Sequence, residues 1–232
     1  MKKTSQIQPA ILGPLGVRAE AALYWVEGQY LFHSSGDAGE QVKFLSAAAL
    51  REAFAKEPVD LGWLPAGVNR AGVSSRGAWM VRWHAPAVYA IRIEGRKTAL
   101  RVPMPALVWF GQKRSYYLWA MKGKTFDPDG RLYRAPVSNV SASTGLVCFG
   151  QNAHPDVAKG GFEATWKTFW TTYFNNDHDR DKSRSMPAAI LPRLRQLIGA
   201  REYPAADLVE VGATLNAAIA RLTRQEGATW ED

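Results

Sequence analysis

Short apolar runs separated by turn residues fill the middle of the chain. Between residues 78 and 121, β-branched and aromatic residues form short stretches divided by Gly, Pro and charged residues, as in strands joined by tight turns. In the first stretch Trp79, Val81 and Trp83 alternate with more polar neighbours, so one face is aromatic. Such a face either packs in a core against a helix or stacks bases, and we favour the core. The pattern predicts an antiparallel meander with strands at residues 78–84, 88–93, 98–102, 106–110 and 116–121.

The segment before this meander predicts a hairpin and a helix. Two β-prone runs within residues 22–33 flank the turn Glu27-Gly28, which is a hairpin signal. Apolar residues at helical spacing predict an amphipathic helix over residues 43–56. Frequent Gly and Pro in residues 58–77 predict an irregular connector.

The last third of the chain predicts helices. Aromatic residues at spacings of three and four indicate a helix over residues 162–174, and the polar residues 175–185 indicate a loop. A helix over 187–198 ends at Gly199, a suitable cap, and an apolar stripe predicts a helix over 204–225. This order of elements, an antiparallel meander flanked by helices and preceded by an amino-terminal strand and helix segment, is consistent with an α+β fold.

Composition is ordinary for a globular protein. Among 232 residues, 47% are hydrophobic and 22% charged, and no apolar run approaches the length of a membrane span. A single cysteine excludes an internal disulfide framework and is typical of a reducing compartment, so we expect a cytoplasmic protein without a membrane partner.

The net charge of +8 comes from scattered Lys and Arg, without a block of five or six. A solvated basic surface is the default interpretation of this pattern. Nucleic-acid binding, which needs a basic stripe on one face, and an acidic protein partner are the two less favoured alternatives.

The histidines do not suggest a metal site. A metal ion needs several His, Cys or carboxylate side chains in convergent positions, and four scattered histidines with one cysteine do not provide them. His33 and His84 stand at the ends of predicted strands and are interpreted as structural or surface residues. No phosphate loop or dinucleotide-binding glycine pattern occurs, so we expect neither a metal nor another cofactor.

Candidate chemistry lies in residues 131–150. The only cysteine, Cys148, follows a polar turn that ends at Gly145, and Asn139 stands nine positions before the thiol. Small polar residues and Gly allow a sharp turn, which places an amide and a thiol near one another at the rim of the domain. Local sequence leaves two interpretations open: a small buried hydrophobe, or a nucleophile whose base lies elsewhere in the fold.

A resemblance favours the nucleophile. The segments Leu132-Tyr133, Ala135-Pro136, Asn139-Val140 and Gly145 to Cys148 resemble, in order and spacing, the active-site region of ubiquitin-conjugating enzymes. With Val102-Pro103-Met104-Pro105 further upstream, the chain is most similar to the prokaryotic ubiquitin-conjugating-enzyme-like family D, which includes the PRTRC system protein B group. The resemblance covers roughly residues 60–180. The His-Pro dipeptide of the eukaryotic enzymes is absent, because Ser138 stands where it would end.

The resemblance implies a function. Cys148 would carry a ubiquitin-like protein as a thioester and pass it to a target amine, with Asn139 as the donor to the developing oxyanion. It implies a ubiquitin-like protein and an activating enzyme as partners, in a bacterial conjugation or anti-phage defence cluster. His154 or Asp156, six to eight residues beyond the thiol, can deprotonate the incoming amine if either faces the site; otherwise both are loop surface.

The resemblance also suggests how the chain is organised. We expect a single domain with a hairpin and helix extension over residues 1–57, a conjugating-enzyme-like core over 58–180 and carboxy-terminal helices over 187–225. Two alternatives remain: a non-catalytic module that binds a ubiquitin-like protein, favoured if Cys148 is buried, and a nucleic-acid-binding protein of a plasmid system.

Overall fold

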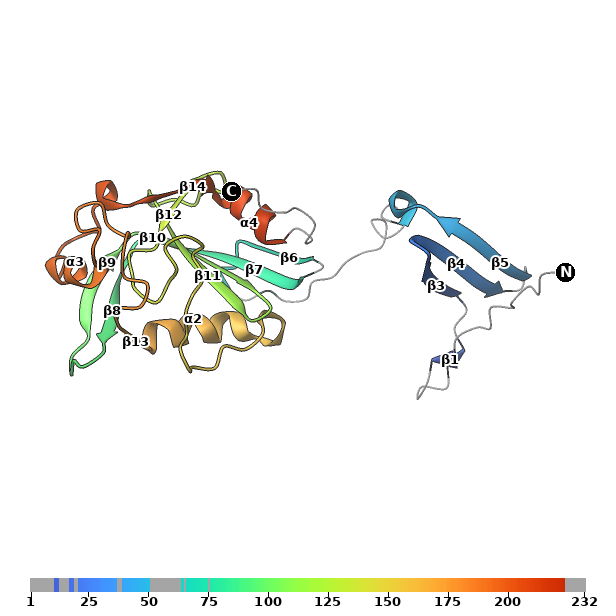
Figure 1. Cartoon of the computed structure of the whole chain (residues 1–232), viewed down its shortest axis with the longest axis horizontal. Coiled ribbons are helices and arrows are strands. Elements are labelled where there is room, and N and C mark those ends of the chain that lie inside the picture. The colour runs from blue at the N-terminus through green and yellow to red at the C-terminus, as the bar shows by residue number, and fades with distance from the viewer. Residues whose placement is uncertain are drawn as a thin grey trace. The chain divides into compact units, whose positions relative to one another are not determined.

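The computed structural model describes residues 11–12, 17–18, 21–36, 39–50, 64, 66–74 and 76–223, and it divides into two compact units, Met1–Gly62 and Trp63–Asp232 (Figure 1). Whether the two fold as one domain stays a prediction. No helix in the described ranges is both long enough and apolar enough to cross a membrane.

The first unit contains the predicted hairpin. Strand β3 (Ala21–Val26) pairs antiparallel with β4 (Gln29–Gly36), and the two turn residues have φ of 47° at Glu27 and 82° at Gly28. Positive φ at both central residues is the turn geometry that matches the twist of two paired strands. The hairpin prediction is confirmed. A separate two-residue pair, β1 (Ile11–Leu12) with β2 (Val17–Arg18), precedes it.

The helix predicted over residues 43–56 begins too early. Residues 43–45 belong to strand β5 (Gly39–Leu45), which pairs with β4. Residues 47–50 are helical, and residues 51–56 lie outside the described ranges. The ladder with β4 overrides helical spacing here, because Phe44 pairs with Leu31 across the sheet.

The main sheet of the second unit has, within the described residues, six strands in the order β14-β12-β11-β10-β7-β6. At its centre β10 (Ala106–Gln112) pairs with β7 (Gly77–His84) and with β11 (Ser115–Met121), and all of β10 is buried. The outer strands are β6 (Arg70–Ser74), β12 (Arg131–Arg134) and β14 (Glu210–Thr214). Strand β6 lies inside the stretch predicted as an irregular connector, so that part of the prediction is wrong.

A second sheet separates two of the predicted strands from the others. Strands β8 (Ala87–Ile93) and β9 (Leu100–Met104) form a hairpin, and the short β13 (Tyr173–Phe174) adds to β8 in parallel. The chain leaves the main sheet at Pro86 and returns to it after Pro105. Proline has no N–H for a strand ladder, which suits both positions to a change of sheet.

Helices cover the two faces of the main sheet. On one face α2 (Gly161–Thr171) buries Phe162 and Phe169 in the larger core cluster, together with α3 (Ile190–Gln196). On the other face α4 (Leu215–Thr223) packs on Trp79 and Val81, so the aromatic face of β7 lies in a core as predicted. The 3-10 helices η2 (Val157–Lys159) and η3 (Ala205–Asp207) complete the described elements. The α+β class with antiparallel sheets and flanking helices is confirmed.

The three helices predicted in the last third are all shorter than expected, and the one over 187–198 is reduced to α3. The helix over 162–174 ends at Thr171, and Tyr173 lies exposed in β13 rather than on the apolar helix face. The helix over 204–225 is wrong in its first half, where η3 and β14 precede α4. Gly212 has a φ of 82° inside β14, a backbone conformation that does not occur within an α-helix.

Candidate functional site

The segment that carries Cys148 runs beside the edge of β11 as a short extra strand. Leu118 N–H donates to the Gly145 carbonyl at 2.9 Å, and Val147 N–H donates to the Tyr116 carbonyl at 2.8 Å. The segment is extended, so its side chains alternate: Val147 and Phe149 are buried, and Cys148 between them is exposed. The fold therefore presents the thiol at the surface while its two neighbours fix the backbone in the core.

A glycine shapes the turn before the thiol. Gly145 has a φ of 77°, and a Cβ built on it would lie 2.3 Å from Nε1 of the buried Trp119. Ser141 closes the same turn, since its carbonyl accepts from Gly145 N–H at 2.9 Å and its Oγ accepts from Thr144 N–H at 3.2 Å. Only a residue without a side chain fits this close approach at this φ.

The structure brings the two predicted site residues together through their backbones. The Asn139 carbonyl accepts from Cys148 N–H at 2.8 Å, and the flanking residues Val140 and Val147 form an antiparallel bridge. Asn139 has a φ of 61°, a left-handed conformation that Asn tolerates better than most residues. Its backbone N–H donates to the Asp177 carbonyl at 2.8 Å.

The Asn139 side chain is mostly buried. Its Nδ2 donates to the Tyr173 carbonyl at 2.9 Å, and its Oδ1 is buried without a hydrogen-bond partner. One of the two amide N–H groups is thus engaged in holding the turn. The second N–H of this amide is the one left to donate to an oxyanion, and this predicted role of Asn139 stays a prediction.

Lys182, which the sequence analysis did not single out, lies behind this turn. It is almost fully buried, and its Nζ donates to the Val137 carbonyl at 2.5 Å and to the Val140 carbonyl. Burial lowers the pKa of this amine to about 7; nearby Asp179 opposes the shift and Arg134 adds to it. In the sequence Lys182 stands in the charged run Asp179-Arg180-Asp181-Lys182, a pattern typical of a solvated loop, and nothing local distinguishes it.

A surface hollow of about 520 Å³ opens beside the thiol. Its ionisable lining besides Cys148 consists of basic or neutral side chains from three segments: Arg114, Tyr116, His154 and His178. His178 belongs to the polar loop predicted after α2, so that loop flanks the thiol. Among the described residues no carboxylate lines this hollow, which favours a negatively charged group near Cys148.

The structure separates the two proton acceptors proposed from the sequence. His154 lines the hollow and stacks on Phe149 with ring centroids 5.1 Å apart. Its Nδ1 lies 3.0 Å from the Asn152 carbonyl, which can only accept, so Nδ1 carries the proton and Nε2 is the acceptor in the neutral ring. Asp156 instead caps η2, where its carboxylate accepts from Ala158 N–H at 2.8 Å. Of these two residues, His154 lines the hollow and Asp156 does not.

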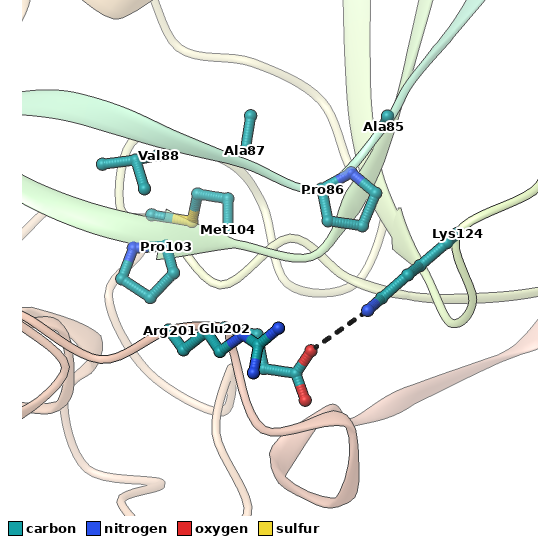
Figure 2. A pocket seen from close by; sticks show the side chains of 9 residues that line it. All are labelled: Ala85, Pro86, Ala87, Val88, Pro103, Met104, Lys124, Arg201 and Glu202. Atoms are coloured by element: carbon teal, nitrogen blue, oxygen red, sulfur yellow. Dashed lines mark ion pairs between the residues drawn. The ribbon is translucent and has the colours of Figure 1, made fainter.

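A second hollow, of about 410 Å³, lies at the other end of the β10–β11 hairpin (Figure 2). Figure 2 shows apolar residues of β8 and β9 facing a charged group in which Lys124 and Glu202 pair at 3.6 Å. In the part of the chain that the structure describes, its lining comprises Ala85, Pro86, Ala87, Val88, Pro103, Met104, Lys124, Arg201 and Glu202, with no cysteine or histidine. Of the two hollows, the one beside Cys148 therefore holds the thiol and the imidazoles.

The remaining histidine of the second unit and the possible metal ligands of the described residues add no further centre. His84 stacks on Trp166 with ring centroids 3.9 Å apart, which is a packing role. Within the ranges that the structure describes, no group of three His, Cys, Asp or Glu side chains gathers in a way that could hold a metal ion.

Comparison with known proteins gives one match. A family model described as prokaryotic E2 family D matches residues 41–211, which is most of the chain. Neither the curated proteins nor the solved structures contain a match.

Proposed function

The chain belongs to prokaryotic E2 family D, whose members are E2-like, and from this premise we propose that it is a conjugating enzyme that carries a ubiquitin-like protein on Cys148. One observation carries the proposal: the only cysteine is exposed, while the residues on both sides of it are buried. Free cysteines are usually buried, so an exposed thiol on a rigid segment supports a reactive role. It also favours this function over a non-catalytic binding module, for which a buried thiol was expected.

The proposed chemistry has two acyl transfers. In the first, the Cys148 thiolate attacks the carbonyl of the ubiquitin-like protein's carboxy terminus, held as a thioester on the activating enzyme. A C–S bond to Cys148 forms, and the bond to the activating enzyme's sulfur breaks. In the second, a target amine attacks the Cys148 thioester, an amide bond forms, and the Cys148 thiolate leaves.

Basic side chains in the hollow suit both transfers. Arg114 and His178 place positive or polar N–H groups around an anionic sulfur and around the oxyanion that develops on the carbonyl. His154 Nε2 takes the proton that the attacking amine releases. The free N–H of the Asn139 amide is the candidate donor to that oxyanion.

The partners follow from the same chemistry. They are a ubiquitin-like protein, an activating enzyme that supplies the first thioester, and a target protein with an accessible amine. We place this activity in the cytoplasm of a bacterium, in a conjugation or anti-phage defence cluster of the PRTRC type.

The test combines the protein with its activating enzyme, ATP and the ubiquitin-like protein, and resolves the products on a non-reducing gel. We expect an adduct that thiols reverse, and Cys148→Ser should give a thiol-resistant ester or no adduct. Cys148→Ala should give none. An unchanged adduct in Cys148→Ala would place the chemistry elsewhere and overturn the proposal.

A further inference from the structure

A buried amine supports the backbone turn that adjoins the thiol. Two carbonyls of this turn, those of Val137 and Val140, point into the protein and bracket Asn139 in the sequence. Buried carbonyls need donors, and Lys182 Nζ supplies one to each. A single side chain therefore fixes both ends of the four-residue turn.

The turn is hydrogen-bonded directly to the segment that carries Cys148, so the position of the turn determines the position of Cys148. On its other side the Asn139 carbonyl accepts from Cys148 N–H, and Val140 bridges to Val147. Asp177, five residues before Lys182, also contacts the turn, since its carbonyl accepts from Asn139 N–H at 2.8 Å. The chain from Asp177 to Lys182 thus clamps the turn at three points, and His178 between them lines the Cys148 hollow.

We propose that Lys182 is a positioning residue for Cys148: by holding the Val137 and Val140 carbonyls it sets the place of the Asn139 turn, and hence of the thiol and His178. This inference rests on the proposed function for its biological meaning, but the positioning itself is independent of any transfer activity. Lys182 does not line the hollow and takes no part in bond making.

The protonation state of Lys182 makes the strength of its hydrogen bonds to the turn depend on pH, which provides a second test of its positioning role. The charged groups that act on it are Asp179 on the same segment and Arg134 on β12, whose Nη1 donates to the Asp181 carbonyl at 2.8 Å. Because the pKa of the amine is lowered to about 7, the ammonium loses its proton near neutral pH in the folded protein. Hydrogen bonds from a charged donor are roughly twice as strong as neutral ones, so the turn is held more firmly below this pH.

The experiment compares wild type with Lys182→Met, which keeps the length of the side chain and removes its donors. Asp207→Asn is the matched control. Asp207 accepts from Ser183 Oγ, Ser185 N–H and Tyr203 O–H, so this variant weakens the adjoining stretch without touching the turn. Two readouts need no partner protein: hydrogen exchange of the Cys148 amide, and the rate at which iodoacetamide alkylates Cys148.

We expect Lys182→Met to raise the exchange rate of the Cys148 amide at least tenfold, and to change the alkylation rate at least threefold. Asp207→Asn should change neither by more than twofold at an equal loss of thermal stability. Wild-type protection of this amide should also fall as pH rises from 6 to 8, and Lys182→Met should not show this change.

Equal exchange and alkylation rates in Lys182→Met and Asp207→Asn would overturn the inference and leave Lys182 a stabilising residue only. If Lys182→Met does not fold, the wild-type protein alone tests the inference: protection of the Cys148 amide that stays constant from pH 6 to 8 would overturn it. Failure of Cys148 to form a thioester would refute the proposed function and leave these readouts unaffected, so the two failures are distinguishable.

Discussion

Replacing Gly145 by alanine tests whether the turn before the thiol depends on a residue without a side chain. Two costs add. At a φ of 77° an alanine is in the left-handed region, which costs roughly 1–2 kcal/mol for a residue with a Cβ. The new Cβ would also lie 2.3 Å from Trp119 Nε1 and 2.6 Å from its Cε2, far inside normal contact.

Trp119 cannot move aside easily. It is only 2% exposed, it stands in β11, and its ring stacks on Tyr117 with centroids 5.7 Å apart. Overpacking of this kind typically costs about 1–3 kcal/mol. Gly145→Ala should therefore lower the free energy of unfolding by roughly 2–5 kcal/mol, a large share of a typical total of about 5–15 kcal/mol.

Gly150→Ala is the matched control. Gly150 lies two residues beyond Cys148 and has a φ of 58°, but apart from its chain neighbours no atom of the described residues lies within 4 Å of the position its Cβ would take. Gly150→Ala is therefore destabilised only by placing a residue with a Cβ in the left-handed region, which costs roughly 1–2 kcal/mol. Urea unfolding of both variants measures the difference, which should be about 1–3 kcal/mol from the clash.

The same pair of variants also reports on the thiol. Because Gly145 and Val147 are tied to Leu118 and Tyr116, relief of the clash must shift the backbone that carries Cys148. Alkylation of Cys148 should change in Gly145→Ala and not in Gly150→Ala. Equal losses of stability in the two variants would refute the reasoning, since they would show that the clash is absorbed without cost.

Two further predictions concern acid–base behaviour and catalysis. Burial, with Arg82 adding to it, lowers the pKa of His84 from 6.5 to about 4, so the unfolded chain binds a proton that the native state does not between these values. Stability should fall as pH drops from 6.5 to 4, and His84→Phe, which keeps the ring stack on Trp166, should flatten that decline in a series of urea unfolding curves; an unchanged slope would contradict the assignment. Asn139→Ala should slow single-turnover discharge of a preformed Cys148 thioester to free lysine by about 10²-fold if its amide donates to the oxyanion, and equal discharge rates would exclude that role.

Local patterns predicted those elements whose neighbours lie close in sequence. The β3–β4 hairpin and the strands β7 to β11 follow from alternation and turn residues, and their bounds agree with the structure to within a few residues. The strand β14 could not be predicted in this way, because its partner β12 lies about 80 residues earlier and Val211 also fits a helical stripe. Pairing over such a distance overrides helical spacing without leaving a local signal.

The candidate site also combines residues that the local sequence identifies with residues that only the tertiary fold brings into place. Cys148, Asn139 and His154 were identified because their residue types and spacing carry chemical meaning. Lys182 was missed, because a lysine within a charged run normally points to water, and only the tertiary fold buries it under the Val137–Val140 turn. His178 was missed for a related reason: its place beside the thiol depends on the path of a loop that has no periodic pattern.

The hydrogen bonds that hold the thiol in place are accepted by backbone carbonyls and not by side chains. The acceptors are the carbonyls of Val137, Asn139, Val140, Tyr173 and Asp177, and a backbone carbonyl is present whatever residue occupies the position. Substitutions at the exposed Tyr173 or Asp177 can therefore accumulate through drift while the geometry around the sulfur persists. A search for equivalent sites in distant chains should accordingly compare main-chain shape around an exposed cysteine, together with one buried amine, before it compares residue identities.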